Sequence, residues 1–298
     1  MRLVFATAIA MLTLIALAGC ERGPQVERTV LSSKPIASQR SAIDDGDNPR
    51  GDGNRDAPNI NLDDLPPPIG NSYHVWSRAN DAGDGSAAHP WRDLQAALCE
   101  LAPGDRLIIL AGVYRGPFRI DADCASGSLE APIEVYAVDD ALLTAGEDAP
   151  VLEIGAEHWH INGIEIAPGR VFSPAVRIAG GAHLTFENCH LHSGTGDGVF
   201  IGPGSQDIEI RDCHIHQLGM HDEGQPYLRP ENPDAAGVRV APGTRDITIT
   251  RTRLHNIRGG AIVIVDPETW ASETGETLPE AENVMADGNL VEKRQAQW

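Results

Sequence analysis

The chain has 298 residues and contains little lysine, little aromatic character and little positive charge. Lys34 and Lys293 stand near its two ends, so no lysine is available as a catalytic base between them. Aromatic residues make up 5% of the chain, and the formal net charge is −20. A negative field of this size repels phosphate, so we expect no nucleic-acid partner.

A repeat is the most informative feature that is present. The pattern Leu184, Phe186, Cys189, Leu191, His192 recurs 24 positions later as Ile208, Ile210, Cys213, Ile215, His216. A third copy, Ile247, Ile249, Leu254, His255, follows after 39 positions, which is 24 plus an insertion of 15. A period of this length is typical of a solenoid, in which each unit buries its apolar face against its neighbours.

The residues inside one period indicate which solenoid this is. Apolar positions alternate, as in strands, and the breaks between them are rich in Gly, Asn, Asp, Pro and Ser. No segment of a repeat has a helical pattern of sufficient length. Three short strands per period of about 24 residues predict an all-β fold, a parallel β-helix, with roughly seven or eight coils between residues 104 and 292.

Matching positions of successive coils stack about 4.8 Å apart in such a fold. The repeat therefore predicts that Val199 and Ile201 point inward. It predicts an outward column of Arg177, Phe200 and Arg239, and a column of histidines at His192, His216 and His255.

Both ends of a β-helix expose strand edges that need a cover. Residues 90–101 place Trp91, Leu94, Ala97 and Leu98 on one side of a helix, which predicts a short capping helix at the N-terminal end. At the other end, residues 266–282 are interpreted as a long acidic loop that folds over the last coil, followed by a strand-like segment at 283–291.

The N-terminus predicts export and lipid attachment. Arg2, an apolar run and Leu-Ala-Gly before Cys20 are typical of a signal peptide, residues 1–19, cleaved at a lipoprotein site. Glu21 favours an outer-membrane address, with the lipid anchor as the only contact with the membrane. Residues 20–72 are interpreted as a disordered tether and 73–298 as the β-helix domain with its cap.

Four cysteines follow Cys20, and an exported protein folds in an oxidising compartment. A disulfide between Cys99 and Cys124 would join the capping helix to the first coils. Cys189 and Cys213 stack inward and are interpreted as core residues, with a bond between adjacent coils left open as an alternative. None of the four has the spacing of a metal site, and the sequence predicts none.

Several segments between residues 73 and 120 carry a family resemblance. Tyr-His-Val-Trp-Ser at 73–77, Asp-Ala-Gly-Asp-Gly at 81–85, His-Pro-Trp-Arg-Asp-Leu-Gln-Ala-Ala at 89–97 and Leu-Ala-Gly-Val-Tyr-Arg at 110–115 are among them. They resemble the N-terminal cap of right-handed β-helix proteins in the pectate-lyase-like superfamily. The resemblance implies a right-handed coil and allows lyases, glycosidases, epimerases and adhesins.

The active-site patterns of that superfamily do not transfer to this chain. A lysine base is excluded, and the Asn-Thr-Asp and Gly-His-Gly signature of polygalacturonases and the Asp-Pro-His-Asp motif of alginate epimerases are missing. The resemblance therefore predicts the fold and leaves the activity open between a lyase, a hydrolase and no catalysis.

The insertion after His216 is the best functional lead, because long loops on a regular scaffold concentrate function. It supplies an imidazole, carboxylates, a phenol and a guanidinium within a short stretch: His221, Asp222, Glu223, Tyr227, Arg229 and Glu231. In a lyase, a histidine or Tyr227 would abstract a proton while Arg239 neutralises the enolate. In a hydrolase, two carboxylates among Asp197, Asp222, Glu223 and Glu231 would flank the bond.

The column of Arg177, Phe200 and Arg239 suits an acidic sugar, whose ring stacks on Phe200 while the arginines bind carboxylates. The alternative is that the arginines pair with carboxylates of the insertion such as Asp222 or Glu223. The histidine column, with His216 as its catalytic candidate, has the alternative that it only forms hydrogen bonds along the turn.

The sequence as a whole favours a monomeric cell-envelope lipoprotein that binds and processes a polysaccharide, preferably an acidic one, as a lyase or hydrolase. The alternative is a non-catalytic adhesin or structural envelope protein on the same scaffold. No cofactor is identified, and calcium at Asp222 and Glu223 stays open.

Overall fold

A computed structural model describes residues 62, 65–80, 83–121, 123–138, 141–145, 148–169, 171–219 and 232–292. The predicted signal peptide, Cys20 and most of the predicted tether lie outside these residues. Neither helix in the described ranges has the length and hydropathy needed to cross a membrane.

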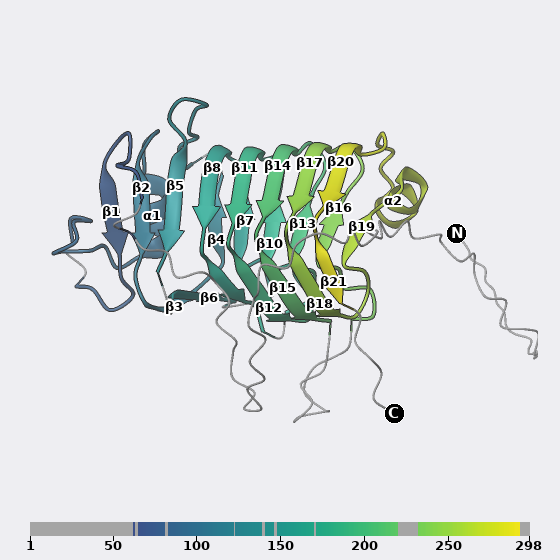
Figure 1. Ribbon diagram of the computed structural model, residues 1–298, viewed down its shortest axis with the longest axis horizontal. Helices are drawn as coiled ribbons and strands as arrows, with labels where there is room; N and C mark the ends of the chain where they lie inside the picture. Colours follow the sequence, from purple (N-terminus) through teal and green to yellow (C-terminus); the bar gives the residue numbers. More distant parts are fainter. Residues whose placement is uncertain are drawn as a thin grey trace, which may run out of the picture.

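Three parallel sheets wind into a stack of coils, so the predicted all-β, parallel β-helix is confirmed (Figure 1). The first sheet, here sheet A, contains β1 (Ser72–Val75), β2 (Arg106–Ile109), β5 (Ile133–Ala137), β8 (Glu157–Asn162), β11 (Ala182–Glu187), β14 (Gln206–Arg211), β17 (Arg245–Thr250) and β20 (Glu282–Asp287).

Sheet B and sheet C complete each coil. Sheet B contains β3 (Gly112–Arg115), β6 (Ala141–Thr144), β9 (Glu165–Ala167), β12 (His190–Gly194), β15 (His214–Leu218), β18 (Arg253–Ile257) and β21 (Leu290–Glu292). Sheet C contains β4 (Phe118–Ile120), β7 (Leu152–Ile154), β10 (Val176–Ile178), β13 (Val199–Ile201), β16 (Val238–Val240) and β19 (Ile262–Ile264).

The register of the coils follows the repeat in the sequence. Leu184 pairs with Ile208, 24 positions on, and Ile208 pairs with Ile247, 39 positions on. Phe200 pairs with Arg239 across the insertion, so the extra residues leave the stack in register. The predicted inward columns are buried, and Val199, Ile201, Val238 and Val240 are at most 1% exposed.

Polar residues in the left-handed backbone region form the corner between sheet A and sheet B. Asn188, Asp212 and Arg251 occupy the same place in three coils, with φ of 52°, 53° and 47°. Asn and Asp tolerate this conformation because their short side chains can form local hydrogen bonds. The Arg251 side chain is held by Asp212, with Nε to Oδ1 at 2.7 Å. The recurrence of Asn and Asp at the repeat breaks thus has a backbone cause.

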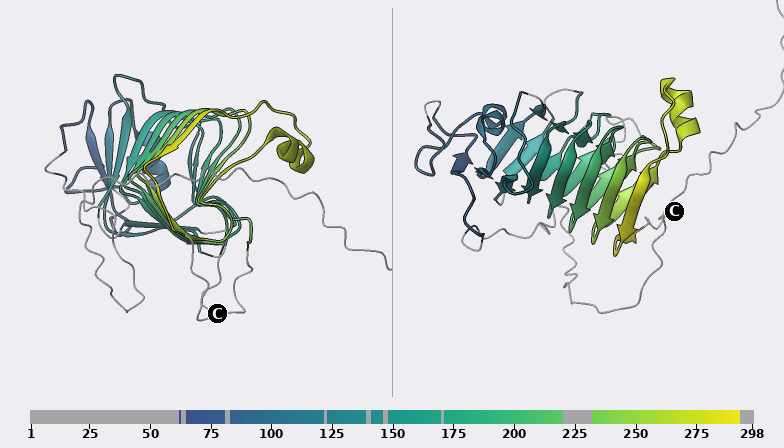
Figure 2. Two further views of the ribbon diagram at one scale, coloured as in Figure 1. Left: turned by 45° about the vertical axis from the view of Figure 1, so that its right-hand side comes forward. Right: turned by 90° about the horizontal axis from the view of Figure 1, so that it is seen from above.

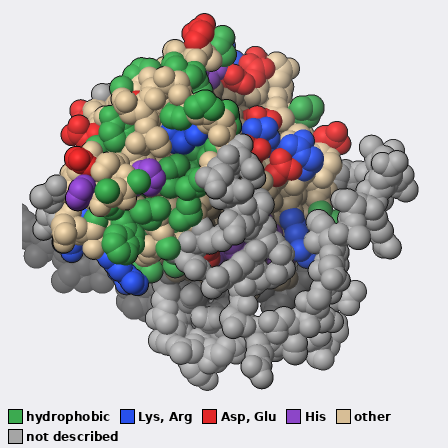
Figure 3. All heavy atoms as spheres, turned by 60° about the vertical axis from the view of Figure 1, so that its left-hand side comes forward, with side chains coloured by type: hydrophobic (Ala, Val, Ile, Leu, Met, Phe, Trp, Pro, Cys, Tyr) green, Lys and Arg blue, Asp and Glu red, His purple; other side chains and the backbone are tan. Residues whose placement is uncertain are grey.

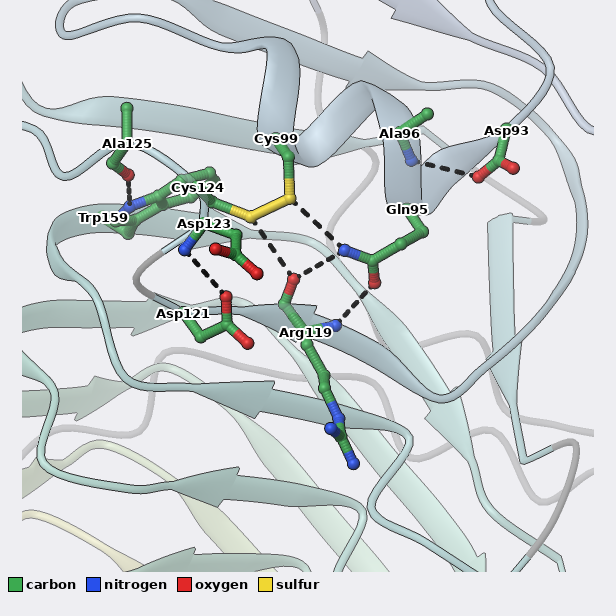
Figure 4. The surroundings of a disulfide bond; sticks show 10 residues. All are labelled: Asp93, Gln95, Ala96, Cys99, Arg119, Asp121, Asp123, Cys124, Ala125 and Trp159. Atoms are coloured by element: carbon green, nitrogen blue, oxygen red, sulfur yellow. Dashed lines mark hydrogen bonds between the residues drawn. A yellow bond between two sulfur atoms is a disulfide. The ribbon is translucent and has the colours of Figure 1, made fainter.

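The N-terminal end is covered by α1 (Leu94–Glu100), which confirms the predicted capping helix. The helix begins later than residue 90 because Asp93 caps it, accepting a hydrogen bond from the Ala96 N–H. Leu94, Ala97 and Leu98 are buried. Cys99 and Cys124 form the expected disulfide, and the Gln95 amide beside it bonds both backbone groups of Arg119 (Figure 4).

The C-terminal end differs from the prediction, because residues 267–274 form a helix and not a loop. α2 (Pro267–Thr274) begins after Asp266, whose side chain accepts the Thr269 N–H, and ends at Gly275 in the left-handed conformation. Trp270 packs against Val263 and Val265, and this contact holds the helix beside the last coils (Figure 2). The strand-like segment at 283–291 is two strands, β20 and β21.

The two remaining cysteines are core residues. Cys189 and Cys213 are free and buried, so the alternative of a bond between coils is not what the structure contains. Burial raises the pKa of the Cys213 thiol well above its usual value, and the neighbouring Cys189 raises it further.

Candidate functional site

Two outward faces of the coil stack carry the candidate functional residues. The first lies on sheet B, where the strands alternate inward apolar and outward polar residues. Leu191 and Ile215 are buried, while the histidines on either side of each point outward. This group, here the histidine face, consists of Glu165, His190, His192, His214, His216 and His255.

Register places the histidines in two adjacent columns. His190 lies opposite His214, and His192 lies opposite His216, which in turn lies opposite His255. The predicted column of His192, His216 and His255 is therefore confirmed. Rings stack within and between columns, with centroids 5.0 Å apart for His190 and His214 and 4.8 Å apart for His216 and His255.

The imidazoles form hydrogen bonds with one another across the columns. The Nε2 atoms of His190 and His216 lie 2.7 Å apart, and those of His214 and His255 are also 2.7 Å apart. His192 differs, because its Nε2 lies 2.9 Å from Glu165 Oε1 and its Nδ1 lies 2.9 Å from the Ser193 hydroxyl. The Nδ1 atoms of His214 and His216 are buried without a hydrogen-bond partner in the described structure.

Burial, and after it the neighbouring histidines, lowers the pKa of three of these imidazoles, to about 4 for His190, about 3 for His214 and about 2 for His216. The pKa of His255 is lowered too, by burial and then by Arg253. The cause is desolvation, which penalises the charged imidazolium. A neutral imidazole has one ring nitrogen with a lone pair, which can accept a hydrogen bond from a neighbouring ring or bind a metal ion.

The second face lies on sheet C. Arg177, Phe200 and Arg239 lie in register on consecutive strands, so the predicted outward column is confirmed. The Arg177 guanidinium lies over the Phe200 ring, with Cζ 5.6 Å from the centroid, and Trp270 of α2 lies nearly parallel to that ring at 6.5 Å. We name Arg177, Phe200, Arg239 and Trp270 the arginine-aromatic face.

Arg239 is committed to an ion pair within the scaffold. Its Nε donates to Asp197 Oδ2 at 2.7 Å, and the two side chains are 23% and 14% exposed. Asp197 also accepts the Ala236 N–H at 2.6 Å, which fixes the turn at the end of the insertion. Burial alone would lower the pKa of Arg239, but the hydrogen bonds and charge of Asp197 raise it. The predicted alternative, pairing of the arginines with carboxylates of the insertion, stays a prediction because Asp222 and Glu223 lie outside the described residues; Arg239 pairs with Asp197, which precedes the insertion.

The structure describes some of the predicted site residues and not others. Asp197, His216, Arg177, Phe200 and Arg239 are described, and Asp197 contacts Arg239, not the histidine column. The residues of the insertion lie outside the described residues, namely His221, Asp222, Glu223, Tyr227, Arg229 and Glu231. Their roles stay predictions.

Four side chains of the two faces escaped the sequence analysis, namely Glu165, His190, His214 and Trp270. His190 and His214 stand two positions before His192 and His216, and in a strand this spacing places them on the same face. The signal was therefore available as a His-x-His pair in two successive coils. Trp270 was missed because the capped helix that carries it was interpreted as a loop.

A cavity of about 670 Å³ lies elsewhere, at the N-terminal cap, between α1 and strands β3 and β4. Trp91, Arg92, Tyr114 and Phe118 are among its lining residues. Figure 3, with this end turned forward, shows hydrophobic side chains gathered on the surface and basic side chains at their margin. Trp91 stacks on Tyr73, and the Tyr114 hydroxyl bonds the Leu110 carbonyl at 2.7 Å, so these groups serve the packing of the cap.

The chain is similar to known β-helices. A family model described as "right handed beta helix region" matches residues 155–273. No curated protein matches the chain.

Solved structures resemble it at low sequence identity. Pectate lyase Pel9A is 18% identical with a TM-score of 0.47, and the match covers 64% of this chain and 55% of that one. An alginate lyase from Paenibacillus sp. is 18% identical with a TM-score of 0.45, over 66% of this chain and 72% of that one. A rhamnogalacturonan lyase is 14% identical with a TM-score of 0.48, and the match covers 74% of this chain and 68% of that one.

The sheet topology and the family model agree on the architecture. The chain is a right-handed parallel β-helix protein with a disulfide-linked cap at its N-terminal end.

Proposed function

We propose that this protein is a cell-envelope lipoprotein that binds and processes a polysaccharide, preferably an acidic one, on the outward faces of its coils. The sequence around Cys20 supports export and lipid attachment at the outer membrane. The resemblance of residues 73–120 to the cap of pectate-lyase-like proteins supports a polysaccharide partner.

The observation that carries the proposal is the packing of Arg177, Phe200 and Trp270. Aromatic faces stack against the C–H faces of sugar rings, and a guanidinium binds a carboxylate through two parallel hydrogen bonds. Arg177 is exposed, and its guanidinium is held over Phe200. Arg239 has its donors turned to Asp197, so Arg177 is the arginine of this face that can reach an acidic sugar.

A binding panel tests the proposal. Purified full chain is mixed with polyuronates, glycosaminoglycans and neutral glycans, and affinity is measured by calorimetry. We expect Arg177→Ala and Phe200→Ala each to weaken binding of an acidic glycan about tenfold, which is about 1.4 kcal/mol. Arg119→Ala is the matched control, because Arg119 stands exposed in the same column two coils away and should leave affinity unchanged.

Turnover is measured on the same samples, as ultraviolet absorbance of unsaturated products for a lyase and as new reducing ends for a hydrolase. Acidic glycans that bind with no dependence on Arg177 or Phe200 would contradict the proposed surface.

A non-catalytic adhesin is the second candidate, and one observation favours it. Among the described residues, Asp197 is the carboxylate proposed for catalysis, and it is engaged by Arg239 and by a backbone amide. Binding across the panel without new products, unchanged in His221→Ala and Tyr227→Phe, would support the adhesin.

A further inference from the structure

The histidine face brings together side chains that are distant in the sequence. His190, His214 and His216 come from two adjacent strands, β12 and β15. Each can offer one ring nitrogen, and the three nitrogens lie within 4.8 Å of one another. A second group, Glu165, His190 and His192, has the same property and shares His190.

These distances are suitable for a metal ion. Zinc binds imidazole nitrogen at about 2.0–2.1 Å, and tetrahedral geometry then separates two ligand nitrogens by about 3.3 Å. The observed separations run from 2.7 Å, between His190 and His216, to at most 4.8 Å for the whole group, and so bracket this value.

The hydrogen bonding inside the cluster is incomplete. Two neutral imidazoles that meet through Nε2 share a single proton, so one ring must carry its own proton on Nδ1. The Nδ1 atoms of His214 and His216 are buried and have no partner among the described residues. An unmet buried polar group costs about 1–3 kcal/mol, so the cluster retains an arrangement that hydrogen bonding alone does not favour.

We propose that His190, His214 and His216 bind one divalent transition-metal ion of the zinc class. Three imidazoles hold such an ion and leave a fourth position for water or for an oxygen of a bound molecule, the arrangement of catalytic zinc sites. Imidazole suits Zn²⁺, Cu²⁺ and Ni²⁺, whereas Ca²⁺ takes six to eight oxygen ligands, which this cluster lacks.

The three-histidine group fits better than the group with Glu165. Both ring nitrogens of His192 are already engaged, one by Glu165 and one by the Ser193 hydroxyl. His190, His214 and His216 instead have other imidazoles as their partners, and an ion can replace those contacts. His255 lies against His214 Nε2 and is a neighbour that would shift when the ion binds.

The test uses Co²⁺, whose visible absorption reports coordination geometry, on purified full chain stripped with a chelator. We expect about one Co²⁺ per chain, an intense four-coordinate spectrum, and loss of that spectrum on addition of one equivalent of Zn²⁺. His214→Ala and His216→Ala should each weaken Co²⁺ binding at least about a hundredfold. His158→Ala and His183→Ala are matched controls, because these two rings also stack, 4.3 Å apart, but on sheet A.

Thermal unfolding with and without Zn²⁺ separates loss of the site from loss of the fold. Zn²⁺ should raise the Tm of the unmodified chain and of the controls, and should leave the Tm of folded His214→Ala and His216→Ala unchanged. The proposal is overturned by a weak octahedral Co²⁺ spectrum, by equal binding in the histidine-face variants, or by equal loss in the controls.

Discussion

Both outward faces are columns of side chains on consecutive strands. They differ in which side chains they place next to one another. On sheet C the column reads Arg177, Phe200, Arg239, so an aromatic ring separates two cations. On sheet B the column reads His192, His216, His255, with like side chains in direct contact. Two unit charges about 4.8 Å apart repel by roughly 3–4 kcal/mol at an effective dielectric constant of 20.

The difference shows which ionisable side chains can stack on consecutive strands. A guanidinium cannot lose its charge, so sheet C tolerates arginines only when they alternate with neutral residues or have a partner such as Asp197. An imidazole can lose its proton, so sheet B stacks histidines at the cost of a depressed pKa. Stacked neutral imidazoles are also what a metal ion needs.

Removing the partner of Arg239 should have the largest effect on stability. Asp197→Ala leaves a largely buried guanidinium without its carboxylate and the Ala236 N–H without its acceptor. We expect the free energy of unfolding to fall by about 2–3 kcal/mol, measured by urea denaturation.

Asp207→Ala is the control for that experiment, since Asp207 also pairs with a side chain, His183, but is 64% exposed. It should cost less than about 0.5 kcal/mol. Equal losses in the two variants would show that Asp197 does not anchor the face.

Acid should destabilise the histidine face of the metal-free protein. The pKa values of His190, His214 and His216 are depressed in the folded state, so their stabilising contribution is complete above the unfolded value of 6.5. This contribution is lost as the pH falls from 6.5 toward 4 and below, because the histidines bind protons in the unfolded chain and stay neutral in the folded chain.

With chelator present, we expect the free energy of unfolding to drop by about 2 kcal/mol between pH 7 and pH 5, allowing for partial exposure of the rings. His216→Gln should make this drop shallower, while the Asp197→Ala variant should retain it. A stability that stays flat over this range would contradict the buried, neutral cluster.

Replacing the aromatic spacer should convert the sheet C column into a repulsive one. Phe200→Arg places three arginines on consecutive strands, and we expect it to cost about 1 kcal/mol more than Phe200→Gln at low salt. The excess should shrink at high salt, because exposed charges are screened. Equal stability of the two variants at low salt would mean that the spacer has no electrostatic role.

The fold was predictable because the sequence repeats with the period of the coils. Leu184, Ile208 and Ile247 recur at matching places, and parallel stacking is the arrangement that buries all of them. Residues 267–274 form a helix although the acidic composition of 266–282 favours a loop, because Asp266, Pro267 and Gly275 are ordinary start and stop signals for a helix. Trp270 belongs to this helix, so the loop prediction does not place it.

The site was predictable only in part, because a column can be deduced from spacing but contacts between columns cannot. The sequence located His192, His216 and His255 on one column, and it offered His190 and His214 two positions earlier. That the Nε2 atoms of His190 and His216 meet at 2.7 Å depends on rotamers and on neighbouring coils. The pairing of Arg239 with Asp197, 42 residues apart, likewise required the turn geometry.

Cross-linking across the insertion tests the register on which both faces depend. Glu209 and Thr248 are partners on adjacent strands of sheet A although 39 residues separate them, and their side chains point outward. Glu209→Cys with Thr248→Cys should therefore close a disulfide under mild oxidation, detected by mass spectrometry of peptides. Thr185→Cys with Thr248→Cys, two coils apart, should not. Closure of the second pair as readily as the first would contradict the register, and with it the histidine and arginine-aromatic faces.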